Sequence, residues 1–237
     1  MKVREVRLYA IRKAAFGEVL VLGCIVILSA GLFVAPRAQA WSSKSYPLFE
    51  PVHQMAIDNV LKKTINSHDL KVLEDEQDAV DADQAASDSF KHSMTGLDKG
   101  QSEFIERPLY IQRSEEFVQE NLAQAIQGRR SGSGDQALRH LGAAIHALED
   151  ATSPVHEPFQ TWSYKEGKWA AATHVFKERI YPDDSAPNFY RSRLEGAVHY
   201  AYDIYVEIAP APARFYDPLS GQLLLPPPYD LRVSNSP

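Results

Sequence analysis

Two histidine–carboxylate pairs with the same spacing are the residues of this chain best suited to chemistry. His146 and Asp150 are four residues apart, and His174 and Glu178 repeat that interval. Residues four apart on a helix lie on one face, so each pair can present an imidazole and a carboxylate to one point. Both groups are zinc ligands. Either pair alone would most simply be an ordinary surface pair.

A fifth potential ligand, His156, lies between the two pairs. Pro154 ends the helix that carries His146, because proline cannot continue the hydrogen-bonding pattern of a helix interior. His156 then falls in the turn that follows, in a Pro-x-His arrangement. With this third element, chance becomes a poor account of the pattern, and the sequence indicates a zinc site.

The elements that must position these residues are helices. Apolar side chains recur at helical spacing along five segments, and no convincing alternating strand pattern is present. The helical segment that carries His146 begins at a predicted Ser133–Gln136 capping box, after a flexible Arg129–Gly134 turn. The sequence predicts an all-α, single-domain, multi-helix bundle over residues 41–208, followed by a proline-rich extended tail over 209–237. The helical segments are 52–65, 109–126, a segment from Ser133 to just before Pro154, 170–180 and 191–208.

Residues 1–40 have the pattern of a secretory signal peptide. A basic start precedes an almost wholly apolar run over Val19–Val34, and Ala38-Gln39-Ala40 supplies the small residues that a signal peptidase recognises. The run is short for a membrane anchor. A lipoprotein signal around Cys24 is the other alternative, but the apolar run continues well past that cysteine. We therefore expect cleavage between Ala40 and Trp41, and a secreted or periplasmic protein.

Cleavage would change both charge and cysteine content. Residues 1–40 hold six basic and two acidic residues of the 25 and 31 in the chain, so 19 basic and 29 acidic residues remain, a net charge of −10. This balance argues against a stable nucleic-acid partner. Cys24 is the only cysteine and leaves with the signal, so the exported protein can form no disulfide and a metal could serve as its cross-link.

These features together resemble the zinc-dependent phospholipase C and P1 nuclease superfamily. That family has a helix with His-x-x-x-Asp, a Pro-x-His six residues after the Asp, and a helix with His-x-x-x-Glu or His-x-x-x-Asp. All three are present at His146–Asp150, His156 and His174–Glu178. Family members begin, after signal removal, with a tryptophan whose amine and carbonyl oxygen bind zinc, helped by a histidine about a dozen residues later. Trp41 and His53 match that pattern.

The resemblance implies a bundle of the phospholipase C/P1 nuclease type that holds three zinc ions. It also implies an aspartate and then a histidine between His53 and His146. His92 is the natural choice for the histidine, and Asp81 and Asp83 both offer the aspartate, with Asp83 fitting the family pattern slightly better. The implied metal ligands are Trp41, His53, Asp83, His92, His146, Asp150, His156, His174 and Glu178.

The activity implied is that of a zinc-dependent phospholipase C. Zinc ions would bind phosphate oxygens and lower the pKa of a water, and Asp83 is the candidate general base. The substrate would be a phospholipid at a membrane surface, cleaved to diacylglycerol and phosphorylated headgroup, and the mature form would have no transmembrane segment. The Trp41–His53 interval and the His-x-x-x-Glu ending favour this branch, although Lys44 would repel a choline headgroup.

Two other functions remain open from the sequence. A P1-type single-strand nuclease would stack bases on aromatic side chains, for which Trp162, Tyr164 and Trp169 are candidates. A non-catalytic zinc-binding protein of the same fold would keep the ligands for stability alone. The three remaining histidines, at positions 68, 140 and 199, are interpreted as structural or surface residues.

Overall fold

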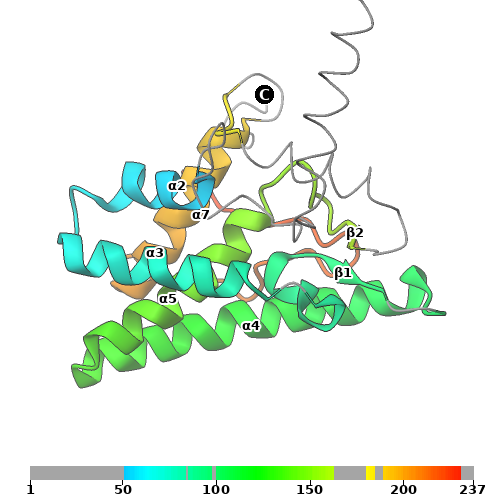
Figure 1. Ribbon diagram of the computed structural model, residues 1–237, viewed down its shortest axis with the longest axis horizontal. Coiled ribbons are helices and arrows are strands. Elements are labelled where there is room, and N and C mark those ends of the chain that lie inside the picture. Colours follow the sequence, from blue (N-terminus) through cyan, green and yellow to red (C-terminus); the bar gives the residue numbers. More distant parts are fainter. Residues whose placement is uncertain (1–50, 84, 98–99, 163–179, 185–188, 231–237) are drawn as a thin grey trace, which may run out of the picture. The chain divides into compact units, whose positions relative to one another are not determined.

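The structure is a computed structural model that describes residues 51–83, 85–97, 100–162, 180–184 and 189–230. All of them belong to one compact unit, Ala38–Pro237. The described part is mostly helical, which confirms the all-α prediction (Figure 1). The predicted signal peptide, the predicted helix over 170–180, and the candidate ligands Trp41, His174 and Glu178 lie outside the described residues.

A helical hairpin of α4 (Glu103–Ser131) and α5 (Gly134–Asp150) forms the base of the fold. The turn between them depends on Gly132, whose φ of 81° lies in the left-handed region that glycine adopts without strain. The predicted Ser133 capping box is wrong, because the Ser133 side chain makes no capping bond and its Oγ lies 3.3 Å from Ser131 Oγ instead.

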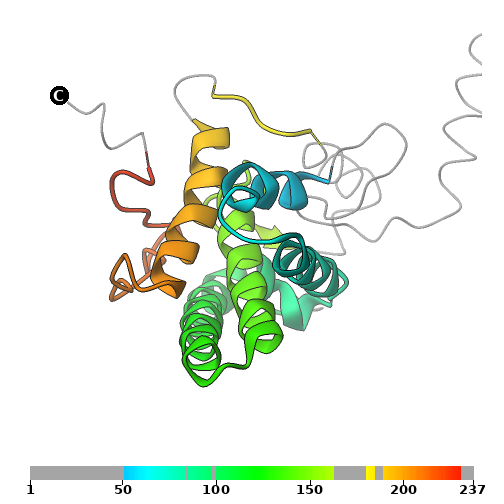
Figure 2. The same cartoon turned by 90° about the vertical axis from the view of Figure 1, so that its left-hand side faces the viewer.

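Helix α5 is the central element. Its final ten residues, from Leu141 to Asp150, are all buried, because helices pack on it from several sides. These are α4, α3 (Ser67–Asp81) and α7 (Tyr190–Tyr205), and α2 (Val52–Leu61) packs against α3 and α7 (Figure 2). The apolar side chains of α5 belong to one hydrophobic core shared by these helices. A helix buried all round can carry polar side chains only where other polar groups meet them.

Helix α3 was not predicted, and its composition explains why. The sequence SHDLKVLEDEQDAVD buries only Val72, Leu73 and Val80 as apolar residues, so its helical stripe is thin. The helix begins where the Asn66 side chain accepts a hydrogen bond from the Asp69 backbone N–H at 2.9 Å. Its buried face also carries Gln77 and Asp81, which point toward α5.

Two short connections that contain no α-helix flank the end of α5. A 3-10 helix, η1 (Ala86–His92), leads into β1 (Thr95–Gly96), which pairs in parallel with β2 (Thr161–Trp162) in the register Thr95 to Thr161. This pairing joins the chain that follows His92 to the chain that follows His156. Within the described ranges these two-residue strands are the only ones, in keeping with the absence of a strand pattern in the sequence.

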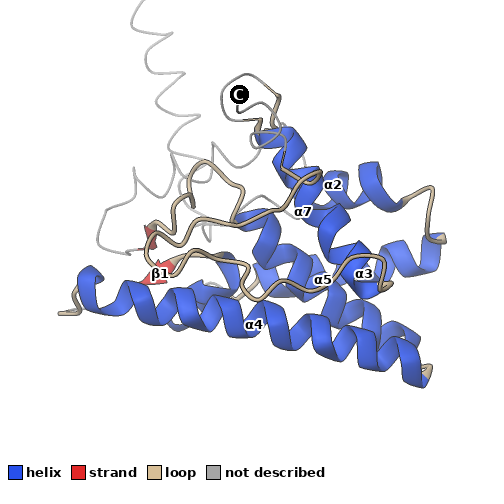
Figure 3. Ribbon diagram, turned by 180° about the vertical axis from the view of Figure 1, so that it is seen from behind, coloured by secondary structure: helices blue, strands red, loops and turns tan. Residues whose placement is uncertain are grey.

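The C-terminal segment is packed, which corrects the expectation of an extended tail. Over residues 209–230 the chain forms no helix, yet Phe215, Tyr216, Leu223 and Leu225 are buried in the same core as the helices. Tyr216 and Leu223 form an isolated antiparallel bridge. Figure 3 shows the segment as a loop that runs over the helices. Burial of these large side chains, which contributes roughly 1.5–3 kcal/mol for each, holds the segment without regular secondary structure.

Candidate metal site

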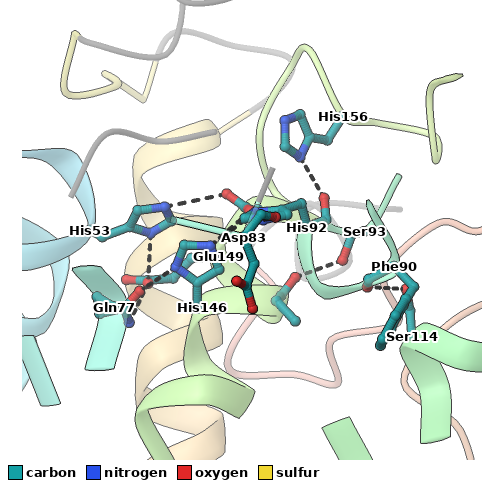
Figure 4. Close-up of polar contacts among 12 residues, drawn as sticks. His53, Gln77, Asp83, Phe90, His92, Ser93, Ser114, His146, Glu149 and His156 are labelled. Carbon is teal, nitrogen blue, oxygen red and sulfur yellow. Dashed lines mark hydrogen bonds and ion pairs between the residues drawn. The ribbon is translucent and has the colours of Figure 1, made fainter. Parts of the chain in front are cut away.

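Imidazoles from three separate parts of the chain meet at the C-terminal end of α5 (Figure 4). His53 comes from the first turn of α2, His92 from the end of η1, and His146 from α5 itself. All three are buried, as is Asp150 in the last position of α5. The packing of α2 and η1 around the buried end of α5 therefore brings together four predicted ligands that lie up to 97 positions apart in the sequence.

The Asp150 carboxylate lies at the centre and uses its two oxygens toward different histidines. Asp150 Oδ1 faces His53 Nε2 at 3.3 Å, while Oδ2 lies 3.0 Å from His92 Nδ1 and 3.2 Å from His146 Nε2. The two nitrogens on the Oδ2 side, His92 Nδ1 and His146 Nε2, are 3.1 Å apart. The potential ligand atoms form two groups, and within each group they lie within 4.8 Å of one another. One group consists of His53, His146 and Asp150, and the other of Asp81, His92 and His146. Either group could hold a metal ion.

Two buried atoms of this cluster, His53 Nε2 and Asp150 Oδ1, are better suited to binding a cation than to bonding with each other. Within the described part of the chain, His53 Nε2 and Asp150 Oδ1 have no hydrogen-bond partner, although both are buried. A buried polar atom left without a partner costs about 1–3 kcal/mol. A cation between the imidazole lone pair and the carboxylate oxygen would satisfy both, so the donor set fits a metal such as zinc.

The structure brings Asp81, and not Asp83, to the cluster, which corrects the choice made from the sequence. Asp81 is fully buried in the last turn of α3 and shares a group of ligand atoms with His92 and His146. Asp83 lies beyond the helix end, half exposed, with its carboxylate 2.6 Å from Lys91 Nζ. Only its backbone oxygen reaches the cluster, at 3.0 Å from His92 Nε2. The candidate general base Asp83 is therefore directed away from the site.

His156 lies next to the cluster in the turn that follows α5. Its Nδ1 lies 2.7 Å from the backbone oxygen of His92, which can only accept, so Nδ1 carries the proton and Nε2 carries the lone pair. The following residue, Glu157, accepts a hydrogen bond at 3.0 Å from the fully buried Arg193 of α7. This ion pair ties the His156 turn to the helical core. The predicted partners of His156, His174 and Glu178, lie outside the described residues.

Sequence reasoning missed two polar residues of the site, Gln77 and Glu149. Both are fully buried. Glu149 Oε2 lies 2.8 Å from His53 Nδ1 and 2.9 Å from Gln77 Nε2, and Gln77 Oε1 lies 2.7 Å from His146 Nδ1. The spacing of four between Gln77 and Asp81 would place both on one helix face and so could have indicated Gln77, but only once a helix over 67–81 is assumed.

Burial and mutual interactions set the charges of the cluster. Burial, followed by the nearby His146, lowers the pKa of His53 to about 3. Burial acts to raise the pKa of Asp150, but His146, His156 and His53 together hold it well below its usual range. A neutral imidazole and an ionised carboxylate are the forms that bind metal, so these two residues are ready to do so near neutral pH.

The pKa values of His92 and Glu149 are raised rather than lowered. Burial opposes protonation of His92, but hydrogen bonding to Asp150 and the charges of Asp150 and Asp81 raise its pKa. Burial and the neighbouring Asp150 raise the pKa of Glu149 well above its ordinary value. A metal ion would therefore compete with a proton at His92.

The other histidines behave as interpreted from the sequence. His68 lies 3.0 Å from Asp135 on the surface, and His140 Nδ1 lies 2.9 Å from the side-chain oxygen of Asn121. His199 is exposed on α7. Neither group of potential metal ligands includes any of them.

Among the described helices, none is long and apolar enough to cross a membrane. No protein-family model, curated protein or solved structure matches this chain.

Proposed function

We propose that this protein is a zinc-dependent phosphodiesterase of the phospholipase C type, which hydrolyses a phospholipid to diacylglycerol and phosphorylated headgroup. The observation that carries the proposal is the buried Asp150 carboxylate, whose two oxygens face imidazoles from α2, η1 and α5. A purely structural ion pair would need one such contact, whereas a shared ligand between two ions needs both oxygens. The mostly helical architecture is compatible with a bundle of the phospholipase C/P1 nuclease type.

The residues divide into three groups of proposed ligands. Oδ2 of Asp150, with Asp81, His92 and His146, would hold one ion. Oδ1 of Asp150 and His53 would hold a second ion together with the amine and carbonyl oxygen of Trp41. His156 would hold a third with His174 and Glu178. Asp81 here takes the ligand position that the sequence had assigned to Asp83.

The chain itself prepares the site for this chemistry. When bound, zinc supplies a Lewis acid for phosphate oxygens and lowers the pKa of a water toward about 7. His53 stays neutral because burial lowers its pKa, and Asp150 stays ionised because three imidazoles hold its pKa down. Asp81 is buried beside His92 and His146, which supports assigning the proton-accepting role to Asp81 rather than to Asp83.

The experiment that tests the proposal uses protein expressed with its leader, so that the host can process it. N-terminal sequencing should begin at Trp41, and metal analysis should find zinc in the purified protein. Vesicles of phosphatidylcholine or phosphatidylethanolamine should release phosphorylated headgroup, and single-stranded DNA should remain intact. Cleavage of DNA to 5′-nucleotides without lipid hydrolysis would favour the nuclease instead. Zinc without either activity would favour a non-catalytic zinc protein, and the absence of zinc would overturn the proposal altogether.

A further inference from the structure

We propose that Gln77 and Glu149 are positioning residues that hold His53 and His146 in the tautomer required of metal ligands. This inference rests on the proposed metal site, but it concerns two side chains that bind no metal in it. Both are fully buried, and they connect the outer nitrogens of the two imidazoles through one continuous chain of hydrogen bonds (Figure 4).

The chain runs from one imidazole to the other in three steps. His146 Nδ1 lies 2.7 Å from Gln77 Oε1, Gln77 Nε2 lies 2.9 Å from Glu149 Oε2, and the same Glu149 oxygen lies 2.8 Å from His53 Nδ1. Each of these distances is that of a good hydrogen bond. The residues come from α3, α5 and α2, so the chain also links three helices.

The acceptor at Glu149 Oε2 decides the direction of every bond. This oxygen accepts from both of its neighbours, so the Gln77 amide must turn its NH₂ group toward Glu149 and its oxygen toward His146. An amide oxygen can only accept, which places the proton of His146 on Nδ1. His53 must likewise carry its proton on Nδ1 to donate to Glu149. The assignment is the same whether Glu149 is ionised or carries a proton on Oε1, because Oε2 accepts in both cases; a proton on Oε2 would reverse it, and the NMR measurement below distinguishes the two.

The consequence appears at the inner nitrogens. With both protons on Nδ1, the Nε2 atoms of His53 and His146 keep their lone pairs, and these atoms face Asp150 at 3.3 and 3.2 Å. The Asp150 carboxylate alone would favour the opposite tautomer, since an Nε2–H could donate to it. Gln77 and Glu149 oppose that tendency by offering acceptors at Nδ1. Outer partners of this kind fix ring orientation and tautomer in metal sites and change affinity by about 10–100-fold.

The test removes the chain at either link while keeping side-chain size. Gln77→Met and Glu149→Met delete the polar groups, and Glu149→Gln is the conservative variant, whose amide oxygen can still accept from His53 and Gln77. Gln54→Met is the matched control, because Gln54 lies beside His53 on α2 and its side chain bonds weakly, at 3.4 Å, to Asp78. All are made in the leader-bearing full chain, as in the functional test.

Two measurements report on positioning rather than folding. In metal-free protein, ¹⁵N NMR of the imidazoles should show Nδ1–H forms for His53 and His146 in the wild type, Glu149→Gln and Gln54→Met proteins. Gln77→Met should shift His146 toward Nε2–H, and Glu149→Met should shift His53. Zinc affinity, measured by competition with a chromophoric chelator, should fall about 10–100-fold in the two Met variants and stay unchanged in the control.

The outcomes separate this inference from the proposed function. Unchanged tautomers and zinc affinity in folded Gln77→Met and Glu149→Met proteins would overturn the positioning role while leaving the metal site intact. A wild-type protein that shows the expected tautomers but binds no zinc would overturn the proposed function while keeping the hydrogen-bond chain. If a Met variant fails to fold, the tautomers of the wild type and of Glu149→Gln decide: Nε2–H forms in these proteins would sink the inference.

Discussion

Helices α5 and α7 each carry a histidine and an aspartate four residues apart, yet the two pairs differ in almost every other respect. His146 and Asp150 on α5 are fully buried, with 3.2 Å between Nε2 and Oδ2. His199 and Asp203 on α7 are separated by 3.8 Å, and the His199 side chain is 57% exposed. Asp203 instead accepts a hydrogen bond of 2.6 Å from the Tyr229 hydroxyl.

The comparison teaches that spacing places two ligands but does not make a site. Around His146–Asp150, three other elements contribute His53, His92 and Asp81. Around His199–Asp203, the neighbours include Tyr229 and Tyr200, whose rings pack against each other with centroids 4.7 Å apart. The first pair is in a polar cluster inside a core, and the second is at the edge of an aromatic contact. Convergence of other chain segments is therefore the feature that distinguishes them.

The largest expected effect comes from comparing the loss of the aspartate in the two pairs. Asp150→Ala should lower zinc affinity by more than the roughly 100-fold that outer partners account for, and abolish hydrolysis, because two of the three proposed ions lose a ligand. Asp203→Ala should leave zinc content unchanged and cost about 1 kcal/mol of unfolding free energy from the lost Tyr229 bond. Metal analysis and denaturant unfolding measure the two effects. Full zinc content in Asp150→Ala would remove the distinction between the pairs.

A smaller effect concerns the pH dependence of the buried cluster. The pKa of His53 falls to about 3 in the folded protein from an ordinary value of 6.5, mainly because the ring is buried. Between these values the unfolded chain binds a proton that the folded chain does not, so stability is lost as pH falls through this window. The slope from His53 should approach about 1.4 kcal/mol per pH unit.

That slope is measured on metal-free protein by denaturant unfolding between pH 6.5 and pH 3. His53→Gln should flatten it, and the difference between the two proteins isolates His53 from its titratable neighbours His92, His146, Glu149 and Asp150. Glu149 acts in the opposite direction, because its raised pKa makes its contribution to the free energy of unfolding decrease as pH rises. Parallel pH profiles for wild type and His53→Gln would show that His53 does not enter the folded state neutral.

The smallest effect tests close packing on α7. A Cβ added at Gly196 would lie 2.1 Å from the backbone oxygen of Tyr229, so the C-terminal segment would have to move. Gly196→Ala should therefore lower the free energy of unfolding by about 1–3 kcal/mol, the range for overpacking, without a change in zinc content. Thermal unfolding and metal analysis provide the measurements. A loss of zinc in this variant would mean that the contact between Gly196 and Tyr229 also supports the metal site.

Sequence patterns predicted much of this fold where apolar spacing was regular. Helices α2, α5 and α7 begin within a residue of the predicted segments, and α4 contains its predicted segment but runs further at both ends. Helix α3 was missed because its charged residues outnumber the apolar ones. That omission also hid the register that buries Asp81 and exposes Asp83, since the helix ends between them.

The site was predictable to the extent that its ligands share a local motif. His146, Asp150 and His156 form such a motif, and His53 and His92 followed from a family resemblance. Glu149 carried no signal, because a carboxylate beside another carboxylate usually indicates a solvated face. Only the three-dimensional packing of α2 and α3 against α5 shows that Glu149 points inward to His53 and Gln77.

The packing of Tyr216 has a consequence for the order of events in the cell. Its hydroxyl lies 2.9 Å from Ser93 Oγ and 3.4 Å from the Ala147 backbone oxygen, between the residue after His92 and the residue after His146. Tyr216 is synthesised after both of these segments, so their contact with it forms only once the chain has reached that residue. A protease that cleaves the chain before Tyr216 would therefore remove a contact beside both His92 and His146 while leaving the four clustered side chains themselves in place.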